Sequence, residues 1–217
     1  MKKPVITEKN VTEILDKKFI HVYDIEFEPG RHYYAASRKA KDNLVCLQEK
    51  HADILPDAVS CFVILEVKDQ KPVLLTFHEY RYPTGQFILS IPSGLIDPSD
   101  TEYGDAIIAA SIREIHEETG IVIKDTDRIT KISHLNFNTP GMTDESTALV
   151  CAVVTLPDLS ELSQAGAEGS EIFDGFTLLT EEDARRILKQ GTDDHGSYYP
   201  MVTWAAMTYF VTGLWRQ

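Results

Sequence analysis

The chain has few cysteines and no long apolar run. Its 217 residues include three cysteines, Cys46, Cys61 and Cys151, without any C-x-x-C spacing. An odd number of scattered cysteines argues against a disulfide framework and indicates reduced, buried thiols. No apolar stretch approaches the roughly 20 residues that a membrane helix needs. The start at Met1 leads into polar residues, unlike the apolar core of a signal peptide. These absences predict a cytoplasmic protein that does not bind a membrane.

Basic residues are also scarce, with 21 Lys and Arg against 34 Asp and Glu and a net charge of -13. Residues 51–217 hold eleven basic and twenty-six acidic residues, whereas residues 1–50 hold ten and eight. Such an acidic body argues against a nucleic acid polymer as partner, because phosphate backbones need basic patches. A small anionic substrate remains compatible, since a divalent cation can reverse the local charge.

The composition, 43% hydrophobic and 25% charged, is that of a globular protein with one good core and an extension. Alternating or continuous apolar patterns predict strands at 19–27, 31–38, 58–67, 72–80, 86–91, 128–137, 147–155 and 172–178. Helices are predicted at 7–17, over the acid-rich segment that ends at Gly120, from Thr180 to Gly191, and at 199–215. We expect an N-terminal β-hairpin extension over residues 1–55 and a main domain over 56–217.

The segment from Arg113 to Ile121 reads R-E-I-H-E-E-T-G-I. Its glutamates, Glu114, Glu117 and Glu118, have i, i+3 and i+4 spacing, which puts them on one face of a helix. Like charges on one face destabilise a plain helix, so a cation is expected against them. Carboxylate oxygens suit Mg²⁺ or Mn²⁺. The alternative is a solvated acidic face, which is the commoner role of an isolated motif of this kind.

Together with Gly94, this segment resembles the signature of the Nudix hydrolase family, G-x5-E-x7-R-E-U-x-E-E-x-G-U, where U is a bulky aliphatic residue. The second half matches at every defined position. Eighteen residues separate Gly94 from Arg113, where the family has thirteen, so about five are inserted between Pro98 and Gly104. The family's early glutamate supports the helix, and Asp105 has the matching distance from Arg113, although Glu102 is the nearest glutamate.

Three further segments resemble the ADP-ribose pyrophosphatase branch of that family. They are Glu79-Tyr80-Arg81-Tyr82-Pro83 for its Q-Y-R-x-P, Pro92-Ser93-Gly94 for its P-A-G, and Pro140 with Glu145 for its S-P-G followed by a glutamate. In that branch an N-terminal hairpin crosses to a partner subunit, where an aromatic ring stacks on adenine. Tyr33 or Tyr34 stands where that ring would be. An aromatic packing pair within a strand is the alternative.

The resemblance implies an α/β fold, the Nudix α/β/α sandwich with a mixed sheet, preceded by a small β extension. The implied ligands of Mg²⁺ or Mn²⁺ are Glu114, Glu117, Glu118 and the backbone carbonyl of Ser93. The implied substrate-binding residues are Arg81, Tyr33, Tyr34, Pro140 and Glu145. The implied catalytic residues are Arg113, Glu118 and a glutamate of a late loop, either Glu168 or Glu171. Glu168 is preferred, because its small neighbours Ala167 and Gly169 leave it freer to move.

The implied reaction is hydrolysis of a nucleoside diphosphate linked to a further group, with ADP-ribose, cleaved to AMP and ribose 5-phosphate, as the leading substrate. A small nucleotide is therefore the expected partner, together with a second copy of the chain in a homodimer. Other nucleotide sugars and nucleoside triphosphates are alternative substrates. A non-catalytic module that senses a nucleotide sugar is an alternative of another class. Loss of a ligand glutamate would favour that module, and none is lost in this sequence.

Overall fold

The computed structural model describes residues 3–49, 54–166 and 171–217. The chain divides into two compact units. The N-terminal unit contains residues 1–57 together with 135–147, and the main unit contains 58–134 and 148–217. A segment from the second half of the chain is thus part of the N-terminal unit.

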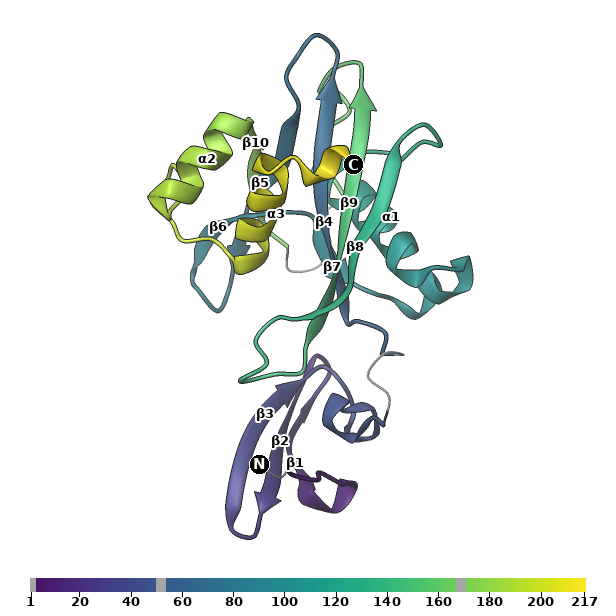
Figure 1. Cartoon of the computed structure of the whole chain (residues 1–217), viewed down its shortest axis with the longest axis vertical. Coiled ribbons are helices and arrows are strands. Elements are labelled where there is room, and N and C mark those ends of the chain that lie inside the picture. Colours follow the sequence, from purple (N-terminus) through teal and green to yellow (C-terminus); the bar gives the residue numbers. More distant parts are fainter. Residues whose placement is uncertain (1–2, 50–53, 167–170) are drawn as a thin grey trace. The chain divides into compact units, whose positions relative to one another are not determined.

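The N-terminal unit is built on an antiparallel sheet of order β1-β2-β3 (Figure 1). Its elements are η1 (Glu8–Asn10), β1 (Val11–Lys17), β2 (Ile20–Glu28), β3 (Arg31–Ser37), η2 (Lys41–Asn43) and η3 (Val45–Leu47), where η marks a 3₁₀ helix. Gly30 joins β2 to β3 with φ of 72°, a conformation that glycine adopts without steric cost. Val11, Tyr23 and Leu44 form a small buried core beside this sheet.

The helix predicted at 7–17 is wrong, because this segment forms β1 after a single turn of 3₁₀ helix. Val11, Thr12 and Ile14 are β-branched, which favours a strand. β1 also pairs with β2, with an irregularity between Glu13 and Leu15. The hairpin predicted from the next two strands is confirmed as β2 and β3. The third strand stabilises a ribbon that would be marginal in water as a hairpin alone.

The main unit contains a sheet of order β10-β5-β4-β9-β8, with β6 paired to β5 and β7 paired to β4. Its strands are β4 (Ala58–Val67), β5 (Val73–Arg81), β6 (Gln86–Ser90), β7 (Ser93–Leu95), β8 (Arg128–Phe137), β9 (Ser146–Leu156) and β10 (Phe173–Leu179). β5 runs antiparallel to β4, β6 and β10. β4 and β9 point the same way in Figure 1, so the sheet is mixed.

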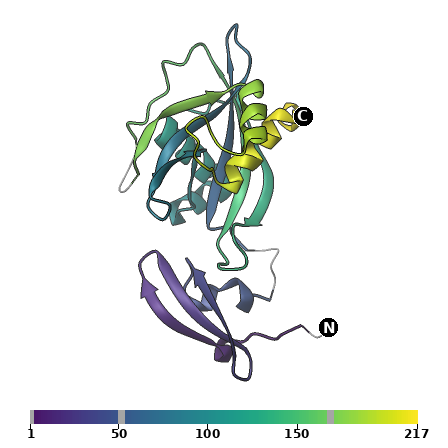
Figure 2. The same cartoon turned by 90° about the vertical axis from the view of Figure 1, so that its left-hand side faces the viewer.

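Helices cover both faces of this sheet. They are α1 (Ala106–Thr119), α2 (Glu181–Gln190) and α3 (Met201–Val211), with the 3₁₀ helices η5 (Pro98–Tyr103) and η6 (Leu214–Arg216). Successive residues of β4 point to opposite faces. Val63 packs in one core with Ile107 of α1, and Ile64 packs in a second core with Phe210 of α3. Figure 2 shows α1 in teal and α3 in yellow on opposite sides of the strands.

This arrangement confirms the predicted α/β/α sandwich with a mixed sheet and a small N-terminal β extension. β8 has the predicted bounds, and α2 begins after Thr180 and ends at Gly191, as predicted. α3 is shorter than predicted. Gly213, with φ of 74°, follows its C-cap Thr212, and the chain then turns into η6.

No helix in the described part of the chain is long and apolar enough to cross a membrane. The three cysteines are all free thiols. Cys61 and Cys151 are buried, as predicted. Cys46 is exposed, which corrects the prediction for that residue, and it lines a cavity of the N-terminal unit.

We expect Phe210→Ala to lower the free energy of unfolding by about 3–5 kcal/mol, the usual cost of truncating a buried aromatic ring. Phe210 is 1% exposed, and its ring centroid lies 6.0 Å from that of Trp215. Trp204→Ala is the matched control, because Trp204 lies on the same helix but is 49% exposed. Urea denaturation followed by circular dichroism measures both variants. Equal losses would contradict the packing described for α3.

Candidate active site

Helix α1 is held at both ends and carries the acidic face. Asp105 is its N-cap, with a carboxylate oxygen that accepts a hydrogen bond from Ile107 N at 3.2 Å. Gly120 ends the helix with φ of 76°, and its N–H donates to the carbonyl of His116. Ile115 is fully buried in the core shared with the sheet. These contacts fix the direction in which the glutamates of the helix point.

Glu114 and Glu118 are buried, with exposed fractions of 6% and 3%, whereas the side chain of Glu117 is 40% exposed. The Glu114 carboxylate lies directly against Gly94, where an added Cβ would come within 2.0 Å of it. Glu118 Oε2 accepts a hydrogen bond from the backbone N–H of Ser93 at 3.0 Å. Strand β7 and helix α1 therefore bring two carboxylates to the same buried place, and only glycine fits beside one of them.

Arg113 connects α1 to the segments that precede it. Its Nη1 donates to Glu114 Oε1 at 2.7 Å and to Glu117 Oε2 at 3.0 Å. Its Nη2 donates to the carbonyl of Leu95 at 2.9 Å. Nε and Nη2 also reach the two carboxylate oxygens of Asp100, at 3.3 and 3.0 Å. One guanidinium thus holds three carboxylates and the end of β7 in a fixed arrangement.

The partner of Arg113 in the inserted segment is Asp100, not Asp105. Asp105 supports the start of α1 as its N-cap and forms an ion pair with Lys131 at 2.8 Å. The insertion does not lengthen α1 but forms the separate 3₁₀ helix η5, and Gly104, with φ of 89°, separates the two. Asp100 is 4% exposed. Burial acts to raise the pKa of its carboxyl, but the hydrogen bonds from Arg113 and from the N–H of Asp97 lower it overall.

Two further glutamates lie near Glu114 and Glu118. Glu79 lies on β5, is 6% exposed and forms an ion pair with Arg81 at 2.7 Å. Its negative charge acts on Glu118, and that of Glu171 acts on Glu79, Glu114 and Glu118. Glu171 lies two residues before Phe173, the first residue of β10, which pairs with Glu79. We call this group the acidic cluster, and it contains Glu79, Glu114, Glu117, Glu118 and Glu171.

The acidic cluster favours a cation. Burial raises the pKa of Glu114 to about 7, although Arg113 opposes the shift. Burial also raises the pKa of Glu118 well above its usual value, with further contributions from the charges of its acidic neighbours. Among the described residues, Arg113 and Arg81 form ion pairs with members of the cluster, and Arg113 is shared with Asp100. The donor set is all oxygen, so these residues fit a hard divalent ion such as Mg²⁺ or Mn²⁺.

Ser93 and Arg81 both lie beside this cluster. The Ser93 hydroxyl bonds Ser60 Oγ and the carbonyl of Ile91, each at 3.1 Å, so the group that Ser93 directs at Glu118 is its backbone N–H. Arg81 lies at the end of β5 with a side chain that is 46% exposed, and Glu79 holds its guanidinium. A half-exposed guanidinium next to a candidate metal site can meet an anionic substrate.

The late loop is fastened to the C-terminal end of α1. Ser163 N–H donates to the carbonyl of Thr119 at 2.9 Å. Gly166 lies so close to Glu117 that an added Cβ would be 2.3 Å from its carbonyl oxygen. Glu168, the preferred loop glutamate in the sequence analysis, lies outside the described residues. Glu171 is described, and its charge acts on the acidic cluster.

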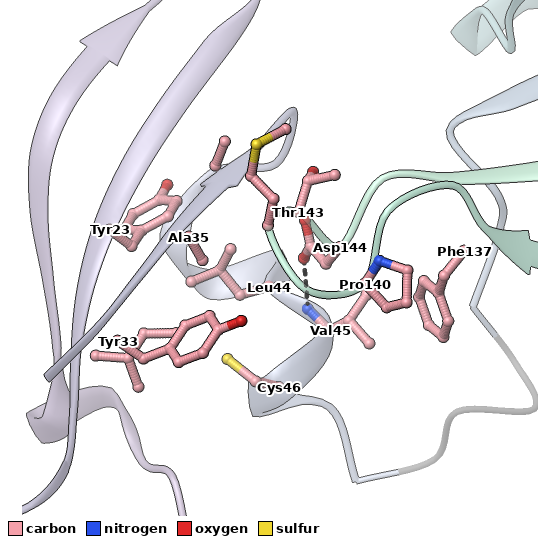
Figure 3. A pocket seen from close by; sticks show the side chains of 13 residues that line it. Tyr23, Tyr33, Ala35, Leu44, Val45, Cys46, Phe137, Pro140, Thr143 and Asp144 are labelled. Atoms are coloured by element: carbon pink, nitrogen blue, oxygen red, sulfur yellow. Dashed lines mark hydrogen bonds between the residues drawn. The ribbon is translucent and has the colours of Figure 1, made fainter. Parts of the chain in front are cut away.

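One predicted substrate residue of the hairpin, Tyr33, meets Pro140 of the segment 135–147 inside the N-terminal unit. Tyr33 and Pro140 line a largely apolar cavity of about 240 Å³ with Tyr23, Phe137 and Asp144 (Figure 3). The Tyr33 hydroxyl donates to the carbonyl of Gly141 at 2.5 Å. Asp144 Oδ2 accepts from Val45 N–H at 3.0 Å, whereas its buried Oδ1 has no hydrogen-bond partner.

Two other predicted substrate residues lie outside this cavity. Tyr34 is 62% exposed and is not part of the cavity wall. Consecutive strand residues point to opposite faces, which separates it from Tyr33. Glu145 forms an ion pair with Arg38. The structure thus groups Tyr33 with Pro140 and leaves Tyr34 and Glu145 apart from them.

Glu79 and Asp100 are the site residues that are absent from the sequence-based set. Glu79 occupies the first position of the E-Y-R-Y-P segment, two residues before Arg81, and this i, i+2 spacing on a strand places both side chains on one face. Asp100 lies in the inserted segment, where no family spacing applies. The available signal was Pro98 after Asp97 and before Asp100, an N-terminal cap for a short helix.

We expect Gly94→Ala to destabilise the main unit by about 1–3 kcal/mol, the usual cost of overpacking. The new methyl group would collide with the Glu114 carboxylate, which Arg113 holds in place. Gly141→Ala is the control, since a Cβ there meets no atom within 4 Å. Urea denaturation compares the two variants. A Gly94→Ala protein as stable as the control would show that Glu114 does not occupy the described position.

Comparison with known proteins identifies the family. A family model described as NUDIX domain matches residues 55–202. A putative nudix hydrolase 2 of Caenorhabditis elegans is 37% identical over 102 residues, which cover 46% of this chain and 41% of that protein. This chain likewise matches less than half the length of the next two relatives, 44% and 29%. An ADP-ribose pyrophosphatase of Bacillus subtilis is 27% identical over 188 residues, covering 85% of this chain and 84% of that protein.

A solved structure described as an ADP compounds hydrolase has a similar fold. It aligns with a TM-score of 0.57 at 18% identity and covers 100% of this chain and 98% of that one. The family match spans most of the main unit and contains all five residues of the acidic cluster. The resemblance drawn from the R-E-I-H-E-E-T-G-I segment is therefore confirmed, and the chain belongs to the Nudix hydrolase family.

Proposed function

We propose that the protein hydrolyses the pyrophosphate bond of a nucleoside diphosphate derivative in a metal-dependent reaction, with ADP-ribose, cleaved to AMP and ribose 5-phosphate, as the leading substrate. The observation that carries this proposal is the acidic cluster, in which buried carboxylates of α1 and β5 converge and the charge of the exposed Glu171 acts on them. Buried carboxylates of like charge are costly unless a cation joins them. A divalent ion in turn attracts phosphates.

Glu114, Glu117 and Glu118, with the backbone carbonyl of Ser93, would hold Mg²⁺ or Mn²⁺. Such an ion neutralises charge on a bound pyrophosphate and lowers the pKa of a bound water. Arg113 positions Glu114 and Glu117 through the hydrogen bonds from its Nη1. The N–H of Ser93 orients the Glu118 carboxylate. This chain thus supplies a ligand set whose orientation is fixed by its own backbone and by one guanidinium.

Two residues of the cluster's rim would act on the substrate. Arg81 would bind a phosphate oxygen with the donors that Glu79 leaves open, since a guanidinium can hold two groups at once. Glu171 would accept a proton from, or orient, the attacking water. Its charge acts on three buried carboxylates, which supports a position beside the ion. Glu171 therefore takes this role in the proposal, in place of Glu168.

The names of two relatives support an adenine nucleotide as the substrate. The Bacillus subtilis relative is named an ADP-ribose pyrophosphatase, and a mouse protein that is 24% identical over 140 residues is named an ADP-sugar pyrophosphatase. The cavity of the N-terminal unit would take the base. Tyr33 offers a ring for stacking, and the unpartnered Asp144 Oδ1 could accept from an exocyclic amine.

The first test is a panel of ADP-ribose, ADP-glucose, other nucleotide sugars and nucleoside triphosphates, each with Mg²⁺ and with chelator. We expect hydrolysis of ADP-ribose that chelator abolishes and Mg²⁺ or Mn²⁺ restores. Glu118→Gln should reduce turnover about 100-fold or more, on the scale of losing one charged group from a catalytic site. Glu102→Gln, an exposed glutamate of η5, is the control. Binding of ADP-ribose without hydrolysis of any compound would instead support a sensing module.

A second test concerns the glutamate near the attacking water. We expect Glu171→Gln to lower kcat about 100-fold at saturating substrate, with little change in KM, because a general base acts in the transition state. Glu168→Gln should have the smaller effect. Steady-state kinetics of both variants decides between them. A larger loss of kcat in Glu168→Gln would reverse the assignment.

We also propose that the protein is a homodimer held by the N-terminal sheet. Leu15 lies opposite Val22, and Val22 lies opposite Ala36, so these side chains share one face. Ile20 and Tyr34 lie two residues from members of this set and belong to the same face. Tyr23 and Leu44 form the core on the other face. We call Leu15, Ile20, Val22 and Tyr34 the outer face. Leu15, Ile20 and Tyr34 are 39%, 45% and 62% exposed, and an exposed apolar surface of this kind is typical of an interface.

The double variant Leu15→Lys/Tyr34→Lys should convert the dimer to a monomer, because it places charge on the outer face, where the two side chains are 39% and 62% exposed. Tyr198→Lys is the control, since Tyr198 is 75% exposed but lies in the main unit. Sedimentation velocity at micromolar concentration measures both. An unmodified protein that sediments as a monomer would refute the dimer.

The free thiols support a cytoplasmic location. Cys46, Cys61 and Cys151 are all free, and free thiols are typical of a reducing environment. A cytoplasmic location, with a small nucleotide as the partner and neither a nucleic acid polymer nor a membrane, is therefore part of the proposal.

A further inference from the structure

A second group of possible metal ligands lies on the other face of the main sheet. His78 is the neighbour of Glu79 on β5, so its side chain points away from the acidic cluster. It meets Asp193 and His195, which belong to the loop between α2 and α3. One ligand atom from each of these three residues lies within 4.8 Å of the other two. We call them the His–Asp–His group.

The group is built around a buried carboxylate. Asp193 is 1% exposed and His78 is 4% exposed. Asp193 Oδ1 accepts the N–H groups of His195 at 2.9 Å and Ser197 at 2.8 Å, which leaves Oδ2 to face His78 Nε2 at 3.0 Å. The backbone of Asp193 also exchanges hydrogen bonds within its loop, with the carbonyl of Ser197 and the N–H of Gly196. The position of the carboxylate therefore does not depend on His78.

The two imidazoles of the group lie against each other, that of His78 buried and that of His195 exposed. Their rings are stacked, with centroids 4.4 Å apart and an interplanar angle of 15°. His78 Nδ1 faces Thr177 Oγ1 at 3.3 Å. His195 is exposed and lies in a turn, so its ring can rotate without disturbing a core. Two histidines and one carboxylate, with one side open to solvent, form a three-ligand set.

We propose that the His–Asp–His group binds a transition metal ion of the Zn²⁺ class. The ligands are Asp193 Oδ2, His78 Nε2 and a ring nitrogen of His195, and water fills the open position. Imidazole nitrogen suits Zn²⁺ rather than Mg²⁺, which distinguishes this group from the all-oxygen acidic cluster. Tetrahedral Zn²⁺ ligands lie about 3.4 Å apart. The separation of His78 and Asp193 is already close to this value, and a rotation of His195 brings in the third donor.

Binding of the ion also fixes which ring nitrogen of His78 carries the proton. A metal ion binds a ring nitrogen that carries no proton, so binding through Nε2 requires the tautomer of His78 with its proton on Nδ1. Thr177 Oγ1 lies at the position to accept from that Nδ1–H. A ligand histidine usually has such a partner for its other nitrogen, which fixes the tautomer. The bound ion would fasten the loop between α2 and α3 to the centre of the sheet.

The experiment uses the full chain with Glu114→Gln and Glu118→Gln, which removes the main carboxylates of the acidic cluster and separates this site from the proposed reaction. Zn²⁺ binding is measured by competition with a chromophoric chelator, and the melting temperature is measured with and without Zn²⁺. We expect one Zn²⁺ per chain and a higher melting temperature in its presence. His195→Ala on this background should weaken binding at least about tenfold and abolish the thermal shift.

The control is His21→Ala, which removes the ring from the exposed group of Glu13, Asp16 and His21 in the N-terminal unit. It should leave both Zn²⁺ affinity and the thermal shift unchanged. Because His195 is exposed, its substitution is not expected to unfold the protein. Absence of stoichiometric Zn²⁺ binding, or equal binding by the His195→Ala protein, would overturn the proposal and leave His78 and Asp193 as a structural hydrogen-bonded pair.

Discussion

The arrangement of the acidic cluster depends on the guanidinium of Arg113. It binds the Asp100 carboxylate through two nitrogens, the carbonyl of Leu95, and the carboxylates of Glu114 and Glu117. These partners come from β7, η5 and α1, three elements that follow one another along the chain. A planar group with fixed donor directions can hold such a set, whereas a lysine ammonium would act as a point charge. Without this group, the glutamates of α1 would repel one another.

The central sheet separates two chemistries that begin on neighbouring residues. On β5, Glu79 points to the side of α1 and joins the acidic cluster, while His78 points to the side of α2 and α3 and meets Asp193. Successive side chains of a strand point to opposite faces of the sheet, so the two neighbouring residues belong to separate groups. Oxygen donors gather on one face, and nitrogen donors with one carboxylate gather on the other. A hard ion and a softer one would therefore have different preferred faces of the same sheet.

The sequence predicts most of the main unit because its patterns are local. The continuous apolar run of β4 and the R-E-I-H-E-E-T-G-I segment of α1 need no distant partner to be recognised. The role of Asp100 is not predictable from the sequence, because it depends on a contact with Arg113, thirteen residues later. Asp100 also lies in the insertion, for which the family signature gives no spacing. Glu79 is not predicted as a site residue, because a glutamate near the end of a strand is usually exposed to solvent. The sequence predicts a helix at 7–17, whereas residues 11–17 form a strand, because the pairing with β2 that decides between the two is a tertiary contact.

The segment 135–147 contains Pro140, which the sequence analysis compares with a motif of the ADP-ribose pyrophosphatase branch. Pro140, compared in sequence with a substrate-contacting motif, folds as part of the N-terminal unit and lines its cavity with Tyr33. Met142 O accepts a hydrogen bond from Ala36 N–H, and Gly141 O accepts one from the Tyr33 hydroxyl, so this loop is also part of what holds β3 in place. The loop that contains Pro140 therefore both supports β3 and lines the cavity. A substitution at Pro140 acts on the fold of the N-terminal unit and on its cavity together, and a change in KM at that position reports a contact with substrate only if β3 remains intact.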